Sequence, residues 1–561
     1  MGSASRAEGV LIGGVSFGCA AVLSSAALAW LAGALHPWVA VVSLVAGAVA
    51  AFVAARQAKA ASEPWTLWEW LAVGAFALLS LRQFLWLVFE RDGALLTLLP
   101  NNYGDLPLHW TYVQQIASGA RFWPENPILT HERLRYPVGV DLLTAVVVSV
   151  GPSLPLALKA IGLFGSLLAA LALRRWGGAF AVAGFLFCGG LAGVPSLLGG
   201  RLVDVDAQVA WKNLYLALFV PQRGFLLALP AGLVLLSSWR SRLLRSERGL
   251  PGWVEALVWG TLPLVHLHTF GFVSLVFAVW TAASGRWREG FASVGQALVP
   301  ATWGVLLVTG GPGSARLVGW APGWAIGDQN AALFLVRNFG FWLPLAAIAL
   351  VAGVRARRRE ALLLLVPSLA LFALLFLVRV APWAWDNTKV MLWCLVAMLP
   401  ALDGLVLGRL RPALRAPVLV LLFASGFASV LWACFGRLPR LEVLNLAEYV
   451  GVCEALAKTP TERVATLQTF NHPVALCGRP LVAGYSGHLW SHGLDASQAE
   501  ARLKRLMLGE PGWREDAEAL GASHVFWGPR EDSAFAASTR PWESLGPPAA
   551  SGRWGALYRL D

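Results

Sequence analysis

The sequence predicts an α-helical protein that crosses a membrane with about 11 to 13 helices and ends in a small α/β domain. Of its 561 residues, 57% are hydrophobic and only 14% are charged, whereas soluble globular domains carry about 25% charged residues. Apolar runs of about 18 residues or more, long enough to cross a hydrocarbon core, recur through the first three quarters of the chain. Charged residues become frequent only after about residue 436, where these runs stop.

The apolar runs define the predicted membrane spans. They cover residues 9–34, 37–55, 67–89, 155–173, 178–198, 219–238, 253–283, 289–309, 329–352, 361–378, 390–408 and 416–435. Residues 253–283 are long for one helix and short for two, and His266-Leu267-His268 interrupts them, so we expect a broken helix or a tight helical hairpin there. We expect residues 137–152 to form a re-entrant or buried segment, because the number of crossings then agrees with the loop charges.

Short basic clusters between the spans predict the orientation of the chain. The clusters are Arg56/Lys59, Arg174/Arg175, Arg240–Arg248, Arg286/Arg288, Arg355–Arg359 and Arg409–Arg415. Lys and Arg are in excess in cytoplasmic loops, which places the N-terminus in the cytoplasm. The remaining loops, at 90–136, 199–218, 310–328 and 379–389, and the chain after 436 then lie outside. Because the formal net charge of +12 comes from these short clusters rather than from one basic face, we expect a lipid bilayer and no nucleic acid as partner.

The composition divides the chain into a transmembrane domain, residues 1–436, and a soluble extracytoplasmic domain, residues 437–561. In the second domain, strand-like runs at Arg463–Thr469, Pro480–Tyr485 and His524–Trp527 alternate with a polar helical stretch near 496–508, which predicts an α/β fold. Cys453 and Cys477 also lie there. Outside the cytoplasm they can form a disulfide or remain free thiols.

Two of the outer loops carry carboxylates with catalytic potential. Asp105 is predicted at the membrane surface, just after the third span, where it either solvates a helix end or acts as a catalytic base or metal ligand. Asp204 and Asp206 are two residues apart, a spacing at which carboxylates can share a hard divalent cation such as Mg or Mn. An Asp-x-Asp motif is common in proteins. The metal hypothesis gains support because the predicted topology places Asp204 and Asp206 on the same side of the membrane as Asp105.

Cationic side chains are predicted near the outer ends of several spans. They are Arg223, Arg337, Arg379 and Lys389. A charge at that depth is costly unless it meets an anion, an acid or water, so together they suggest an anionic ligand. Asp386 and Lys389 either pair with each other or bind an acceptor hydroxyl and a phosphate. His266 and His268 can share a metal only if the helix is broken between them, and hydrogen bonding to neighbouring helices is the commoner role.

Several short motifs resemble the C-type (GT-C fold) glycosyltransferase superfamily of bacteria, whose multi-spanning members use polyprenyl-phosphate-linked sugars. The motifs are Tyr-Gly-Asp-Leu-Pro-Leu-His (103–109), Trp-Pro-Glu-Asn-Pro (123–127), Leu-Arg-Tyr-Pro (134–137), Pro-Gln-Arg (221–223), Leu-Pro-Leu-Val-His-Leu-His (262–268), Trp-Asp-Asn-Thr-Lys (385–389) and Asn-His-Pro…Gly-Arg…Gly-Tyr (471–485). The resemblance implies that Asp105, the acid of the first outer loop, is a general base or metal ligand. Many members have two acids there, whereas here Leu106 and Pro107 follow a single Asp, so Asp204 and Asp206 would have to supply further metal oxygens.

The sequence therefore predicts an inner-membrane glycosyltransferase. It would move a sugar, with inversion, from a polyprenyl-phosphate donor to a glycan, lipid or protein acceptor outside the cytoplasm. Asp105 would be the base, and Arg223, Arg337, Arg379 and Lys389 would bind the donor phosphate. The residues expected to contact acceptor or substrate are His109, Gln222, His266, His268 and Asp386. The alternatives are a flippase or transporter of lipid-linked glycans, and a catalytically degenerate assembly protein. Transporters often contain inverted repeats, and we find no convincing internal repeat in this sequence.

Overall fold

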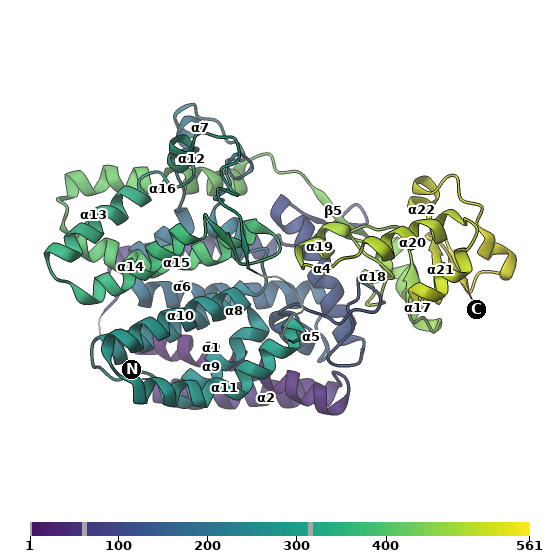
Figure 1. Ribbon diagram of the computed structural model, residues 1–561, viewed down its shortest axis with the longest axis horizontal. Helices are drawn as coiled ribbons and strands as arrows, with labels where there is room; N and C mark the ends of the chain where they lie inside the picture. Colours follow the sequence, from purple (N-terminus) through teal and green to yellow (C-terminus); the bar gives the residue numbers. More distant parts are fainter. Residues whose placement is uncertain (1–2, 59–63, 312–317, 561) are drawn as a thin grey trace.

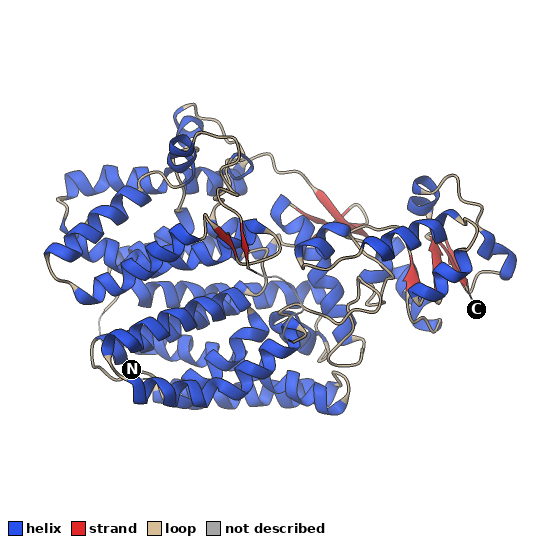
Figure 2. Ribbon diagram, in the orientation of Figure 1, coloured by secondary structure: helices blue, strands red, loops and turns tan. Residues whose placement is uncertain are grey.

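The computed structural model describes residues 3–58, 64–311 and 318–560. A large helical bundle forms one end of an elongated molecule, and a smaller domain that contains a sheet forms the other (Figures 1 and 2). Within the described ranges, seven helices are long and apolar enough to cross a membrane, or up to eight if a bent pair is counted as one span. The seven are α1 (Ser3–Ala32), α2 (Pro37–Gln57), α6 (Leu154–Phe187), α10 (Leu267–Ser284), α11 (Trp287–Thr309), α15 (Asn387–Leu405) and α16 (Pro412–Phe435).

This number is lower than the dozen spans that the apolar runs predict. Several of the runs form helices shorter than the roughly 20 residues that a full crossing needs. These are α8 (Phe225–Trp239, 15 residues), α9 (Gly252–Val265, 14 residues), α13 (Trp342–Arg355, 14 residues) and α14 (Arg359–Leu374, 16 residues). The run 155–173 and the first half of the run 178–198 form one element, α6, which breaks at Gly177-Gly178 and ends at Phe187. The end of the second run forms the separate short helix α7 (Val194–Leu198). Gly178 has φ 63° and ψ −154°, a conformation open only to glycine.

Of the two alternatives predicted for residues 253–283, a broken helix or a tight helical hairpin, the structure shows the hairpin, because Trp259 Nε1 of α9 donates to Ser274 Oγ of α10 at 2.9 Å. α9 ends at Val265 and α10 begins at Leu267, and between them His266 has an extended backbone with φ −165° and ψ 104°. A second break separates α12 (Ala331–Asn338) from α13, and these two helices meet at 87°. The segment predicted to be re-entrant or buried is α5 (Gly139–Val148), and its residues 139–146 are buried.

The loop predicted to lie outside the membrane at residues 90–136, which we call the outer loop, is ordered by a small sheet. Its strands β1 (Phe89–Arg91) and β2 (Ala94–Thr97) form a hairpin, and β2 pairs antiparallel with β5 (Leu441–Asn445), which follows the last long helix. The chain then enters α4 (Pro100–Ala117), which begins with Pro100 at its first position, where a missing N–H costs nothing. The pairing with β5 thus fixes the start of α4 against the C-terminal part of the chain.

The C-terminal part contains a four-stranded sheet in the order β6-β7-β9-β8, with β6 and β7 parallel and the other pairs antiparallel. Its strands are β6 (Val464–Ala465), β7 (His524–Trp527), β8 (Ala550–Gly552) and β9 (Gly555–Arg559). Its helices are α17 (Leu446–Lys458), α18 (Pro473–Leu476), α19 (Ser486–Ser491), α20 (Ser497–Leu508), α21 (Trp513–Leu520) and α22 (Pro529–Ala534). A disulfide joins Cys453 to Cys477.

The strand predicted at Pro480–Tyr485 is wrong, because this segment divides its backbone hydrogen bonds between two partners. Val482 N donates to Val464 O of β6 at 3.1 Å, whereas Leu481 N donates to Pro127 O of the outer loop at 2.8 Å. Gly484 N donates to Ile128 O at 2.8 Å. The segment therefore docks the outer loop onto the C-terminal sheet instead of extending that sheet.

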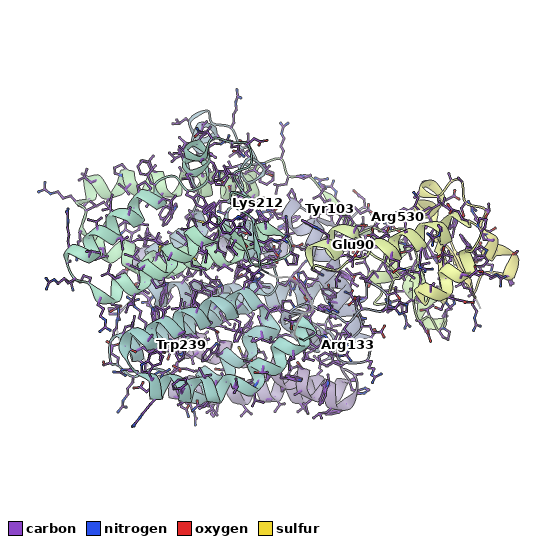
Figure 3. The ribbon with its side chains drawn as sticks, viewed as in Figure 1. Glu90, Tyr103, Arg133, Lys212, Trp239 and Arg530 are labelled. Carbon is purple, nitrogen blue, oxygen red and sulfur yellow. A yellow bond between two sulfur atoms is a disulfide. The ribbon has the colours of Figure 1, made fainter. Side chains whose placement is uncertain are left out.

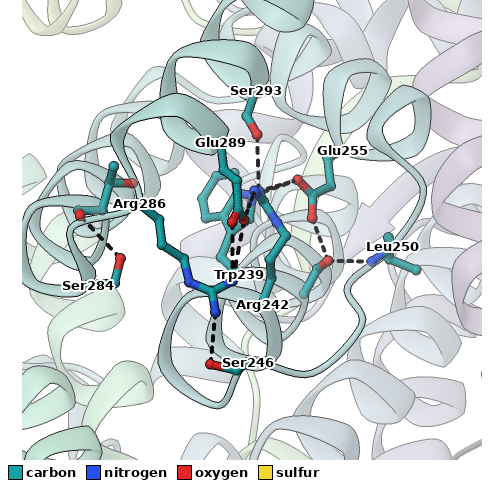
Figure 4. Close-up of polar contacts among 11 residues, drawn as sticks. Trp239, Arg242, Ser246, Leu250, Glu255, Ser284, Arg286, Glu289 and Ser293 are labelled. Carbon is teal, nitrogen blue, oxygen red and sulfur yellow. Dashed lines mark hydrogen bonds and ion pairs between the residues drawn. The ribbon is translucent and has the colours of Figure 1, made fainter.

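A buried polar network ties helices together in the part of the bundle far from the C-terminal domain, where Figure 3 labels Trp239. Glu255 of α9 accepts hydrogen bonds from Ser238 Oγ at 2.5 Å, Trp239 Nε1 at 3.1 Å and an Arg242 guanidinium nitrogen at 2.8 Å. Arg242 also donates to Ser293 Oγ of α11 at 3.0 Å (Figure 4). The network stabilises the junction of α8, α9 and α11, because each buried charge has a partner.

Candidate active site

Polar side chains from five segments gather at the end of the bundle that faces the C-terminal domain. The segments are α4, the turn that precedes α8, the start of α10, the 3-10 turn Ala384–Asp386 with the first turn of α15, and α19 of the C-terminal domain. α4 and α19 lie at this junction in Figure 1. We call the residues that these segments bring together the junction cluster: Asp105, His109, Gln222, His268, Asp386, Lys389, His488 and His492.

Asp105 is the carboxylate of this cluster with the clearest chemical role. It is half-buried in α4, and Gln222 Nε2 donates a hydrogen bond of 2.7 Å to its Oδ2. Burial raises the pKa of Asp105, and Asp386 raises it further, while the charges of His109 and Lys389 and the Gln222 hydrogen bond oppose the shift. A carboxylate whose pKa is raised is a stronger base once it is ionised. Gln222 keeps one of its oxygens in a fixed position.

His109 lies one helical turn after Asp105, and its imidazole contacts a buried acid, Asp141. Its Nδ1 is 2.9 Å from Asp141 Oδ2 of α5, and both residues are almost fully buried. Because a carboxylate can only accept, Nδ1 carries the proton. Arg223 Nε lies 3.8 Å from the other side of this carboxylate, and Arg223 also donates to Thr144 Oγ1 at 3.3 Å. The contact with Asp141 fixes the His109 imidazole, and the Arg223 charge neutralises the buried Asp141 carboxylate.

Asp386 and Lys389 form an ion pair at the start of α15. Lys389 Nζ is 3.1 Å from Asp386 Oδ2, and only 9% of Lys389 is exposed. The positive charge of Lys389 interacts electrostatically with Asp105, His268 and His492. Lys389 is therefore the cation of the junction cluster.

The C-terminal domain contributes neutral histidines to the cluster. His488 Nε2 donates to the Gly104 carbonyl oxygen, one residue before Asp105, at 3.1 Å. The His492 ring lies 4.8 Å from the ring of Tyr136. Burial lowers the pKa of His488 to about 4 and that of His492 to about 3, so both imidazoles are uncharged at neutral pH. The site is thus built from both parts of the chain.

The structure does not bring all of the predicted site residues to this cluster. Arg223 is buried behind His109, against Asp141. Arg337 lines a separate small cavity together with Asp206. Arg379 donates to the Pro382 carbonyl oxygen at 3.1 Å. Of the predicted phosphate ligands, Lys389 is the one whose charge acts on Asp105 in the described structure, and the phosphate roles of the three arginines stay predictions.

The remaining predicted ligands have local structural partners. Asp206 accepts from Ser429 Oγ at 2.8 Å and from Asn213 N at 3.1 Å, and burial raises its pKa to about 6. Asp204 Oδ1 accepts from Ala207 N at 3.1 Å. His266 caps α10 by accepting from Thr269 N at 3.2 Å, and its ring lies 5.5 Å from that of His268. In the described ranges, no three His, Cys, Asp or Glu side chains are grouped so that they could hold a metal ion. The predicted divalent cation stays a prediction.

Sequence reasoning on its own does not identify Asp141, Tyr136, His488 and His492 as one site. Asp141 is a single acid inside an apolar run, and the two histidines lie more than 340 residues after Asp141 in the chain. The only available signal is the unusual density of His and Trp between residues 488 and 492.

Comparisons with known proteins leave the family of this chain open. No protein-family model and no curated protein matches it. Among solved structures, it is similar to the apo form of the oligosaccharyltransferase from Archaeoglobus fulgidus, with a TM-score of 0.42 and 15% sequence identity. The match covers 82% of this chain and 69% of that one.

Proposed function

We propose that this chain is an integral-membrane glycosyltransferase. It moves a sugar from a polyprenyl-phosphate donor to a hydroxyl of a glycan, a lipid or a protein outside the cytoplasm. The observation that carries the proposal is Asp105, a half-buried carboxylate with a raised pKa, held by Gln222 and lying near the cation Lys389. A positioned base next to a cation, at one end of a set of membrane-length helices, suits a lipid-borne phosphate substrate.

The reaction needs one displacement. The acceptor atom attacks the anomeric carbon, the bond from that carbon to the phosphate oxygen breaks, and the lipid phosphate leaves with the bonding electrons. Asp105 takes the proton that the acceptor loses. Lys389 stabilises the negative charge that develops on the departing phosphate. Because the acceptor attacks from the side opposite the leaving group, the anomeric configuration is inverted.

Two groups assist without bonding to the reacting atoms. Gln222 orients the Asp105 carboxylate through its 2.7 Å hydrogen bond. His109, held by Asp141, keeps a fixed imidazole one turn from Asp105.

The proposed role of Asp105 predicts an acid limb in the pH profile. The base works only when it is deprotonated, so kcat/KM rises as the pH increases through the pKa of Asp105. Burial raises this pKa, so the limb is expected above the value of about 4 that is usual for a carboxyl. Initial rates between pH 4 and 9 measure it. A kcat/KM that stays constant down to pH 4 would exclude a buried Asp105 as the base.

The proposed orientation predicts an oxidised Cys453–Cys477 pair in cells, because disulfides persist in oxidising compartments. The chain has six cysteines, and four of them, Cys19, Cys188, Cys394 and Cys434, are free. Cells quenched in acid, denatured and treated with a maleimide-polyethylene glycol should give four tags, and six after reduction. Six tags without reduction would place the domain in a reducing compartment. The Cys453→Ser/Cys477→Ser variant is the control and gives four tags in both lanes.

The activity itself is tested with purified full-length protein and a panel of radiolabelled polyprenyl-phosphate sugars. The expected result is release of unglycosylated polyprenyl phosphate together with a labelled acceptor product. Movement of the intact donor across a vesicle membrane without bond cleavage would favour a transporter instead.

A further inference from the structure

The part of the bundle far from the junction cluster contains a second charged site. A hollow of about 540 Å³ lies between the turn that joins α13 to α14 and the end of α15, and Arg240, Arg357, Arg358, Arg359 and Arg409 line it. Glu360 is the one acid among its lining residues. In Figure 1 the turn that joins α13 to α14 lies on the side away from the C-terminal domain.

Glu360 does not neutralise this hollow, because two arginines already share its carboxylate. Arg240 Nε lies 2.6 Å from Glu360 Oε1, and a guanidinium nitrogen of Arg245 lies 2.8 Å from the same oxygen. In the part of the chain that the structure describes, Arg357, Arg358 and Arg409 form no ion pair with an acid. Three exposed guanidinium groups therefore face one space without a counter-charge.

The turn that carries two of these arginines is held in place. Arg357 N donates to Val354 O at 3.1 Å, and Arg358 N donates to Gly353 O at 2.9 Å. These two hydrogen bonds hold the backbone of the turn against the last turn of α13. The Arg357 and Arg358 side chains therefore extend from a fixed backbone. Guanidinium groups held together in this way suit a phosphate, which they bind through charge-assisted hydrogen bonds.

An apolar hollow adjoins the cationic one and suggests what carries the phosphate. It measures about 640 Å³, and Ala347, Ile348, Val351 and Ala352 of α13 line it together with Arg355 and Arg409. Arg409 belongs to both hollows. Ile348 and Val351 are 56% and 49% exposed, as expected for side chains that meet lipid. The apolar wall from Ala347 to Ala352 runs along about 8 Å of helix, which suits part of an acyl chain.

We propose that these two hollows together bind one anionic phospholipid, with its phosphate among Arg357, Arg358 and Arg409 and an acyl chain along Ile348 and Val351. The apolar wall favours a lipid over a free phosphate, because a soluble anion makes no use of it. Basic pockets between membrane helices are a known way of holding anionic head groups. The site is separate from the junction cluster and does not depend on the proposed glycosyl transfer.

The test is native mass spectrometry of the purified full-length protein in micelles doped with phosphatidylglycerol or with phosphatidylcholine. Wild type is expected to retain phosphatidylglycerol about tenfold better than phosphatidylcholine, given the attraction of several arginines to an anionic head group. The Arg357→Gln/Arg358→Gln/Arg409→Gln variant is expected to lose this preference. Inorganic phosphate at millimolar concentration is expected not to displace the lipid.

Two further variants separate the site from the overall charge. Arg56→Gln/Arg248→Gln/Arg288→Gln removes the same charge from basic clusters outside the hollow and should retain the preference. Ile348→Trp/Val351→Trp fills the apolar wall, leaves every arginine in place and should weaken retention of phosphatidylglycerol. Equal retention of the two lipids by wild type, or an equal loss in both arginine variants, would overturn the proposal. So would displacement by phosphate combined with no effect of the two tryptophans, because a free anion would then be the ligand.

Discussion

Asp105→Asn protein is expected to turn over a polyprenyl-phosphate sugar donor at least about 100-fold more slowly than wild type, because general-base catalysis typically contributes 10²–10⁴-fold. The amide has nearly the shape of the carboxylate but cannot take the acceptor proton. Its Oδ1 can still accept the hydrogen bond that Gln222 Nε2 donates at 2.7 Å in the native chain. The fold should therefore persist, and the loss should appear in kcat rather than in KM.

The control for this experiment is Asp92→Asn. Asp92 lies in the turn between β1 and β2 of the same outer loop, and its side chain is 89% exposed. This variant makes the same chemical change away from the junction cluster and should match wild type. Turnover by Asp105→Asn within threefold of wild type would remove Asp105 from the mechanism.

Asp141→Ala should destabilise the protein by about 3–5 kcal/mol, because removing one member of a buried ion pair leaves the other charge without compensation. Asp141 and Arg223 are 1% and 2% exposed, and Arg223 Nε lies 3.8 Å from the Asp141 carboxylate. The free energy of unfolding in detergent, or the melting temperature if unfolding is irreversible, measures the effect. His109 loses its anchor in the same variant, so its imidazole should also become less ordered.

The double variant Asp141→Ala/Arg223→Met tests the cause of that loss. Replacing the guanidinium by an apolar chain of similar length removes the uncompensated charge, so the double variant should recover much of the lost stability. If both variants unfold at the same temperature, the loss comes from the cavity or from His109 rather than from the Arg223 charge.

The sequence predicts the helical bundle well because its signals are local. Each apolar run overlaps at least one helix, and His266, a polar residue within such a run, correctly marks the break between α9 and α10. The length of an apolar run does not predict how long the helix is or where it ends. Turns and kinks shorten α8, α13 and α14 below a full crossing, and they depend on packing that the sequence pattern does not contain.

Only part of the candidate site can be predicted from local signals. Asp105, Gln222 and Lys389 stand out because polar residues are rare beside apolar runs. Their mutual positions depend on tertiary packing. So does the position of Arg223, which lies against Asp141 and not beside Asp105. His488 approaches Gly104 across 384 residues, a distance at which neither periodicity nor spacing carries information.

The pairing of β2 with β5 also has a consequence for biogenesis. Strand residues 94–97 reach their partners only after residues 441–445 have been synthesised, and the contacts of Pro127 and Ile128 wait for residues 481–484. Contacts between parts of the chain so far apart form late. The bundle can insert into the membrane helix by helix as the ribosome advances, while α4 and Asp105 reach their final places only after residues 481–484 have left it. The helices of a nascent chain are thus inserted before its candidate active site is complete.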